Sequence, residues 1–143
     1  MANYVLDTSA ILALFKSEPG HEAVTDILRR AEDEPTDHVY VPFLALMEVE
    51  YQFIRDMTED RVQYWLNVAL NWPIEVVEST PEWRHRAAAV KAPGHVSLAD
   101  SWVAALALIH DADLVHKDPE FENVPNLKHL KLPYDRDTRR TNR

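Results

Sequence analysis

Short apolar runs alternate with helix-like segments along this chain, and this alternation limits its fold more than any other feature. Five runs have the length and composition of buried β-strands, at 4–6, 39–41, 74–77, 114–116 and 127–132. Six segments are predicted to be helices, at 10–15, 21–31, 43–57, 59–71, 80–92 and 98–109. Strands that are joined by helices form parallel sheets covered on both faces. We therefore predict an α/β/α sandwich with a short central parallel sheet.

The helix at 43–57 shows how the apolar residues repeat. Its large apolar residues recur every three or four positions, which is the spacing of one helix face. We expect most of this face to pack into the core. The residues are Phe43, Leu46, Met47, Tyr51 and Ile54.

Polar residues mark the starts of two helices. Thr8 and Ser9 are expected to cap the first helix, because hydroxyl side chains accept hydrogen bonds from the first free amide groups. Ser97 is expected to cap the helix at 98–109 in the same way.

The composition excludes several kinds of site. The 143 residues fit one domain, which we place at 1–133, followed by a basic, frayed tail at 134–143. Cysteine is absent, so disulfides, thiolate metal sites and cysteine nucleophiles are excluded. With 2 glycines in all, the glycine-rich loops that bind phosphate cannot be built. No signal peptide or membrane span is recognisable, and we expect a cytoplasmic protein without membrane contact.

The charge of the chain is uneven. Its 24 acidic and 15 basic residues give a net charge of −9, which does not favour binding of a polyanion. The end of the chain is basic, with Arg136, Arg139, Arg140 and Arg143 in the tail. These arginines could contact RNA phosphates or form a solvated end, and both interpretations stay open.

Four acidic residues are expected where parallel α/β sheets bind ligands, beyond the carboxyl ends of the strands. Asp7 follows the first strand and Asp118 follows the fourth. Asp100 lies in the first turn of the helix that leads to the fourth strand, and Glu48 lies within the helix after the second. Glu50 competes with Glu48 for the second position, because residues two apart on a helix cannot face the same site.

Each acid also has an ordinary structural interpretation. Asp7 and Asp118 could form turns, Asp100 could complete a capping box with Ser97, and Glu48 could face solvent. Together, however, clustered carboxylates repel one another and lose solvation unless cations compensate. The hard ions Mg²⁺ and Mn²⁺ prefer carboxylate oxygen, and such clusters commonly serve phosphoryl transfer. The four acids therefore predict a divalent metal site.

Four segments resemble the motifs of the PIN-domain family, in the order of that family. They are VLDTSAIL at 5–12, LMEVEY at 46–51, SLADSWVAA at 97–105 and DLVHKDPEF at 113–121. Each contains one of the four acids, and the resemblance in order and spacing covers residues 3–132. In length and layout the chain is most similar to the VapC toxins of toxin–antitoxin pairs.

The resemblance implies a metal-dependent endoribonuclease, a hydrolase that uses Mg²⁺ or Mn²⁺. The metal ligands that carry over are Asp7, Glu48, Asp100 and Asp118. Thr8 or Ser9 carries over as a polar neighbour that orients the site, and Ser9 is preferred. The resemblance also implies a small antitoxin that blocks the site and a homodimer. The helices at 43–57 and 59–71 offer surfaces for either partner.

One position departs from the family pattern. His116 stands two residues before Asp118, where the family often has Thr or Ser. The imidazole could bind phosphate or turn away from the site.

Two other functions remain open. The strand-terminal Asp7-Thr8 is similar to the start of haloacid-dehalogenase-like phosphatases, in which an aspartate becomes phosphorylated. That family needs a second aspartate two residues later, where this chain has Ser9. A catalytically silent binding module with a PIN fold is the other alternative, although a silent site has no reason to keep a repulsive cluster of acids.

Overall fold

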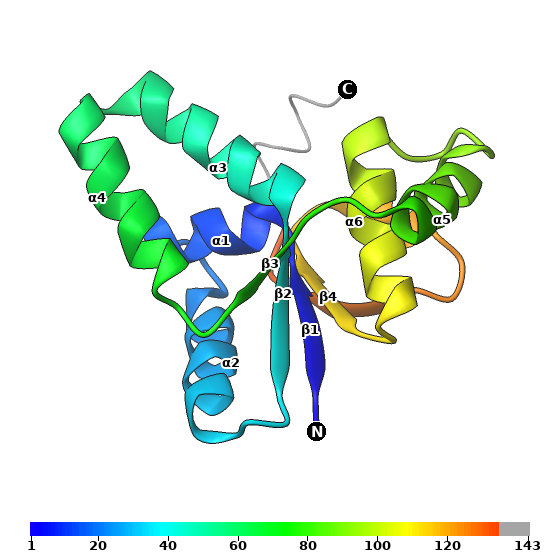
Figure 1. Ribbon diagram of the computed structural model, residues 1–143, viewed down its shortest axis with the longest axis horizontal. Helices are drawn as coiled ribbons and strands as arrows, with labels where there is room; N and C mark the ends of the chain where they lie inside the picture. The colour runs from blue at the N-terminus through cyan, green and yellow to red at the C-terminus, as the bar shows by residue number, and fades with distance from the viewer. Residues whose placement is uncertain (135–143) are drawn as a thin grey trace.

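A five-stranded sheet forms the centre of the computed structural model, which describes residues 1–134 (Figure 1). The strands are β1 (Asn3–Leu6), β2 (His38–Pro42), β3 (Glu75–Val77), β4 (Asp113–His116) and β5 (Lys128–Lys131). Their order across the sheet is β3-β2-β1-β4-β5, and every neighbouring pair is parallel. The predicted sandwich with a central parallel sheet is confirmed.

Helices cover both faces of the sheet. One face carries α1 (Thr8–Phe15), α2 (His21–Asp33), α3 (Phe43–Asp56) and α4 (Glu59–Leu70), and the other carries α5 (Pro81–Lys91) and α6 (Leu98–Ile109). Figure 1 shows the two groups on opposite sides of β1 and β2. A short 3-10 helix, η1 (Pro119–Asn123), follows β4 and was not expected as more than a turn.

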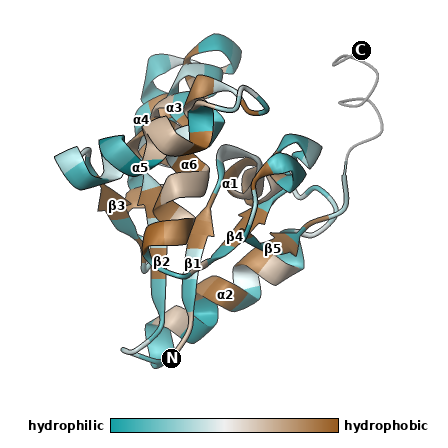
Figure 2. Cartoon of the chain, turned by 90° about the vertical axis from the view of Figure 1, so that its right-hand side faces the viewer, coloured by the Kyte–Doolittle hydropathy of each residue, from teal (hydrophilic) through white to brown (hydrophobic). Residues whose placement is uncertain are grey.

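Two hydrophobic cores lie on the two faces of the sheet, and the central strands contribute to both. In β1, Leu6 faces the core under α1–α4, whereas Val5 faces the core under α5 and α6. In β4, Val115 faces the core under α1–α4, and Leu114 faces the core under α5 and α6. All four side chains are fully buried. Figure 2 shows brown, hydrophobic stretches on the strands and much teal on α5. Burial on two faces explains why these strands read as continuous apolar runs.

The buried face of α3 differs from the predicted one. Ala45, Val49 and Phe53 point into the core, at intervals of four residues. Met47 and Ile54, which belonged to the predicted core face, are 54% and 61% exposed. The prediction was wrong because α3 carries apolar residues on two faces, and spacing alone does not tell which face packs.

The start of α1 also differs from the prediction. Asp7, and not Thr8 or Ser9, is the N-cap residue, with extended backbone angles (φ −75°, ψ 163°) and a carboxylate that accepts from the Ser9 N–H at 3.3 Å. The helix begins at Thr8 because this acceptor already stands at the end of the strand. Ser97 caps α6 as predicted, and its Oγ accepts from the Asp100 N–H at 3.2 Å.

The remaining predictions concern the chain as a whole. No helix among residues 1–134 has the length and hydropathy needed to cross a bilayer. The predicted basic tail, apart from Tyr134, lies outside the described residues.

Candidate active site

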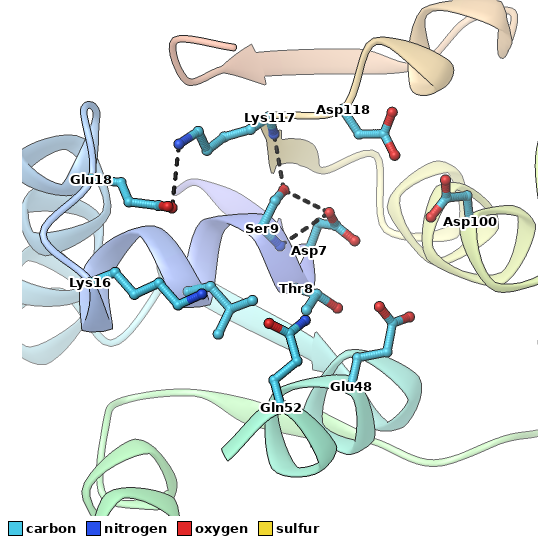
Figure 3. Close-up of a pocket in the computed structure, with 11 residues that line it drawn as sticks. Asp7, Thr8, Ser9, Lys16, Glu18, Glu48, Gln52, Asp100, Lys117 and Asp118 are labelled. Carbon is cyan, nitrogen blue, oxygen red and sulfur yellow. Dashed lines mark hydrogen bonds and ion pairs between the residues drawn. The ribbon is translucent and has the colours of Figure 1, made fainter. Parts of the chain in front are cut away.

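A cleft of about 520 Å³ opens at the carboxyl ends of β1 and β4. Its walls come from α1, α3, the start of α6 and the segment after β4 (Figure 3). The four acids predicted from the sequence and the preferred Ser9 all line this cleft. They are Asp7, Ser9, Glu48, Asp100 and Asp118.

Asp7 stands at the end of β1 in the centre of the sheet. Its backbone N–H donates to the Val115 carbonyl oxygen at 3.1 Å, which fixes it beside β4. The side chain is only 7% exposed, and burial raises the pKa of Asp7 to about 6, although hydrogen bonds from Ser9 oppose part of this rise. The residue therefore caps α1 and also presents a poorly solvated carboxyl group to the cleft.

Ser9 connects Asp7 to the strand beside it. Its hydroxyl donates to Asp7 Oδ2 at 2.7 Å and accepts from the Lys117 N–H at 3.0 Å. The Thr8 hydroxyl is buried and lies near Glu48 instead of Asp7. Ser9 therefore contacts Asp7 directly, and its role in orienting the site stays a prediction.

Glu48 and Glu50 lie on different faces of α3. Glu48 lines the acidic cleft, and burial raises the pKa of its carboxyl group, an effect that the nearby Thr8 hydroxyl partly opposes. Glu50 instead lines two shallow grooves on the outer side of α3, together with the exposed Ile54. The position of Glu50 leaves Glu48 as the α3 carboxylate of the cleft.

Asp100 and Asp118 approach each other from α6 and from the end of β4. The backbone N–H of Asp100 makes the capping bond to Ser97, whereas its carboxylate faces the cleft (Figure 3). Asp118 Oδ1 accepts from the Glu120 N–H at 2.9 Å, so Asp118 also starts the turn into η1. Both acids therefore combine a structural role with a place on the cleft wall.

Glu120 is an acid that sequence reasoning missed. One carboxylate oxygen from each of Asp100, Asp118 and Glu120 can be chosen so that the three lie within 4.8 Å of one another. Burial, a proton shared with Glu120 and the negative charges of Asp7 and Asp118 raise the pKa of Asp100 well above its usual range. The sequence signal that could have identified Glu120 is its position two residues after Asp118. The tight 3-10 turn directs Glu120 to the same side as Asp118.

His116 turns away from the cleft. The side chain is fully buried, its Nδ1 accepts from the Asp118 N–H at 3.0 Å, and its Nε2 lies 2.9 Å from His129 Nδ1. Burial, together with the positive charges of His129 and Lys131, lowers the pKa of His116 to about 4. A neutral His116 thus holds the backbone beside Asp118. Of the two possibilities predicted for the imidazole, binding phosphate or turning away from the site, the structure has the second.

The donor set fits a hard divalent cation. Carboxylate oxygens are the ligands that Mg²⁺ and Mn²⁺ prefer. The raised pKa values of Asp7 and Asp100 show that these groups hold negative charge poorly without a compensating cation. The buried Thr8 hydroxyl adds a further oxygen on the same wall.

Replacing Ser9 with alanine tests its link between Asp7 and Lys117. The Ser9→Ala variant leaves the buried Lys117 N–H without its acceptor, so we expect the free energy of unfolding to fall by about 1–3 kcal/mol. The pKa of Asp7 should rise further, because a hydrogen bond that favours its charged form is lost. Urea denaturation and an NMR titration of Asp7 measure the two effects.

Thr8→Val is the matched control, since the Thr8 hydroxyl lies on the same cleft wall but bonds neither Asp7 nor the Lys117 N–H. Valine has nearly the same shape and only the contact with Glu48 is lost, so the free energy of unfolding should fall by less than in Ser9→Ala. Equal losses in both variants would contradict the role of the Ser9 contacts.

Comparison with known proteins supports the same fold. The sequence model of the PIN domain matches residues 4–127. No curated protein sequence matches the chain. Similar solved structures include VapBC2 from Rickettsia felis, bound to a DNA fragment from their promoter, with 17% identity, a TM-score of 0.76 and coverage of 92% of this chain and 99% of that chain.

Two further structures have the same fold. DNA-bound VapBC from Salmonella typhimurium has 18% identity and a TM-score of 0.76, with coverage of 92% of this chain and 98% of that one. VapBC-5 from Mycobacterium tuberculosis has 19% identity and a TM-score of 0.61, with 92% and 100% covered. Because the domain model spans most of the sequence and the fold agrees with it, the chain belongs to the PIN-domain family.

Proposed function

We propose that this protein is a metal-dependent endoribonuclease and the toxin of a toxin–antitoxin pair. One observation carries the proposal: carboxylates from β1, α3, α6 and the end of β4 converge on one cleft. Keeping them together costs stability through repulsion and lost solvation, which is understandable if the site holds cations for its function. Phosphoryl transfer is the chemistry that such sites commonly serve.

In the proposed mechanism, the carboxylates of the cleft hold Mg²⁺ or Mn²⁺. The ligands are Asp7, Glu48, Asp100 and Asp118, with Glu120 beside the last two. A bound divalent ion would offset the charge of the scissile phosphate and lower the pKa of a water molecule. Ser9 fixes the direction of the Asp7 carboxylate, and His116 fixes the backbone at Asp118. The side chains thus bind and orient, and none of them needs to act as a nucleophile.

Protein partners form the second part of the proposal. We propose a small antitoxin that covers the cleft, a homodimer and a cytoplasmic location. Structures with this fold include a toxin–antitoxin complex from Klebsiella pneumoniae and a member of the VapBC family of toxin–antitoxin systems. The exposed apolar side chains Met47, Tyr51 and Ile54 of α3 border a groove of about 320 Å³, which gives a partner chain apolar surface to bury.

Incubation of the purified protein with single-stranded RNA tests the nuclease function. We expect internal cleavage with Mn²⁺ or Mg²⁺ and none after chelation with EDTA. Without bound cations, the clustered carboxylates would repel the phosphate of the RNA. Sequencing of the product ends would define the cleavage sites. A phosphorylated aspartate would instead support the phosphatase alternative, and no turnover with any divalent metal would support the silent binding module.

A further inference from the structure

We propose that the groove between α1 and α3 binds the RNA strand beside the scissile phosphate, and that Lys16 binds the phosphate of a flanking nucleotide there. The inference rests on the proposed nuclease function and names the part of the same cleft that would hold the substrate. It assigns a role to Lys16, which the sequence analysis did not single out.

Two rows of side chains form this groove. Thr8, Leu12 and Lys16 follow one another at intervals of four along α1, and Glu48 and Gln52 do so along α3. Residues four apart lie on one helix face, so each row is continuous. The α1 row extends about 12 Å, from the rise of 1.5 Å per helical residue. The groove is therefore longer than the acid cluster at one end of it.

Charge is distributed unequally along the cleft. Figure 3 shows Asp100, Asp118 and Glu48 toward one end and Asp7 between the ends, while Lys16 lies toward the other end, on the same side as Glu18, which is paired with Lys117. A polyanion that enters the cleft meets carboxylates, which require metal ions, and then a cationic side chain. This polarity suits a phosphate chain whose scissile group lies at the acids.

Lys16 is better placed to bind phosphate than the other lysine of the cleft. Lys117 is only 8% exposed, and its Nζ lies 3.4 Å from Glu18 Oε1, so a carboxylate already neutralises it. Lys16 is exposed and forms no ion pair with the residues that the structure describes. Its ammonium group can therefore bind a phosphate without first giving up another charged partner.

The backbone beneath Lys16 is fixed by the turn that ends α1. Lys16 is the C-cap, Ser17 adopts a left-handed conformation (φ 51°), and the Glu18 N–H donates to the Ala13 carbonyl oxygen at 2.9 Å. This is the hydrogen-bond pattern of a Schellman motif. A fixed backbone reduces the entropy that binding would otherwise cost, and the same turn directs Glu18 to Lys117.

The α1 row offers groups that suit a nucleotide. The Thr8 hydroxyl lies near the Glu48 carboxylate at the acidic end of the row, Leu12 adds apolar surface, and Lys16 adds a cation at the other end. One wall of the cleft therefore combines hydroxyl, apolar and cationic groups.

The test is the Lys16→Gln variant, with Arg84→Gln as matched control and Lys16→Arg as conservative replacement. Arg84 is exposed on α5, on the other face of the sheet, and its replacement changes the net charge equally. With a single-stranded RNA decamer and Mn²⁺, we expect Lys16→Gln to raise KM about tenfold while kcat stays within about twofold. The slope of log(kcat/KM) against log salt should flatten by about 0.7, the loss of one phosphate contact on a single strand.

Lys16→Arg should restore KM, and Arg84→Gln should change neither KM nor the salt slope. If Lys16→Gln behaves like Arg84→Gln, Lys16 acts only as a cation at the end of α1, and the inference fails while the nuclease function stands. If the wild type cleaves RNA with no divalent metal, the proposed function fails and the inference fails with it. Melting temperatures of all variants confirm that differences in KM do not come from unfolding.

Discussion

Asp7→Asn and Asp100→Asn are each expected to abolish metal-dependent RNA cleavage, by a factor on the order of a thousand or more, while the protein stays folded. An amide keeps the shape of the carboxyl group but is a poor ligand for a hard cation. Asparagine is also a good N-cap residue, so α1 should keep its start at Thr8. Cleavage of a labelled RNA and Mn²⁺ binding by calorimetry measure the two losses.

Glu50→Gln is the matched control for these variants. Glu50 lies on α3 only two positions from Glu48, but it faces the outer grooves. Its replacement should leave cleavage and Mn²⁺ affinity unchanged. Expression in cells extends the test to the proposed toxin role, because the wild type and Glu50→Gln should arrest growth, whereas Asp7→Asn should not. Near wild-type cleavage by Asp7→Asn or Asp100→Asn would exclude these residues as metal ligands.

The metal-free protein is expected to lose stability as the pH rises from about 4 to about 6. The pKa of Asp7 is raised from 3.8 to about 6 in the folded state, so the folded protein binds this proton more tightly than the unfolded chain. Stability therefore falls with pH in the window between the two pKa values. The shift corresponds to about 3 kcal/mol. The raised pKa of Asp100 acts in the same direction, over a window that begins at the same unfolded value of 3.8 and extends to higher pH.

Urea denaturation in EDTA at several pH values measures this effect as a difference between wild type and Asp7→Asn. The Asp7→Asn change also removes a negative charge that raises the pKa of Asp100, so the wild type should lose at least about 3 kcal/mol relative to Asp7→Asn across this window. Parallel curves would show that burial does not raise the pKa of Asp7.

Added Mn²⁺ should reverse the loss. An ion that binds only the folded protein stabilises it by about 2.7 kcal/mol at a hundredfold excess over Kd. The gain should be smaller at pH 5, where protons compete for the carboxylates, and smaller in Asp7→Asn at any pH. An equal gain in both proteins would place the ion elsewhere on the acidic surface.

The exposed apolar residues of α3 follow a regular helical spacing, but the prediction that they pack into the core was wrong. The spacing of Met47, Tyr51 and Ile54 does define one helix face, but Ala45, Val49 and Phe53 form the face that packs against α1 and the sheet. Small and aromatic residues together fill the narrow space there. Apolar residues that remain outside leave a surface for the partner that we propose.

The sequence by itself determined the order of strands and helices, since both depend on periodicities and breakers within a few neighbouring residues. It also determined which acids stand near strand ends, because Asp7 directly follows one apolar run and Asp118 follows another after a single residue, Lys117. The Ser97 cap followed from the same local chemistry.

Only the tertiary structure decided which side chains share the cleft. The choice of Glu48 over Glu50 depends on the rotation of α3 about its axis, which contacts distant in sequence fix. Glu120 joins the acids through the turn after β4. Lys16 and Gln52 line the same cleft, although one stands at the end of α1 and the other on α3. Such contacts form because burial of the two cores brings remote segments together, and no local pattern in the sequence records that packing.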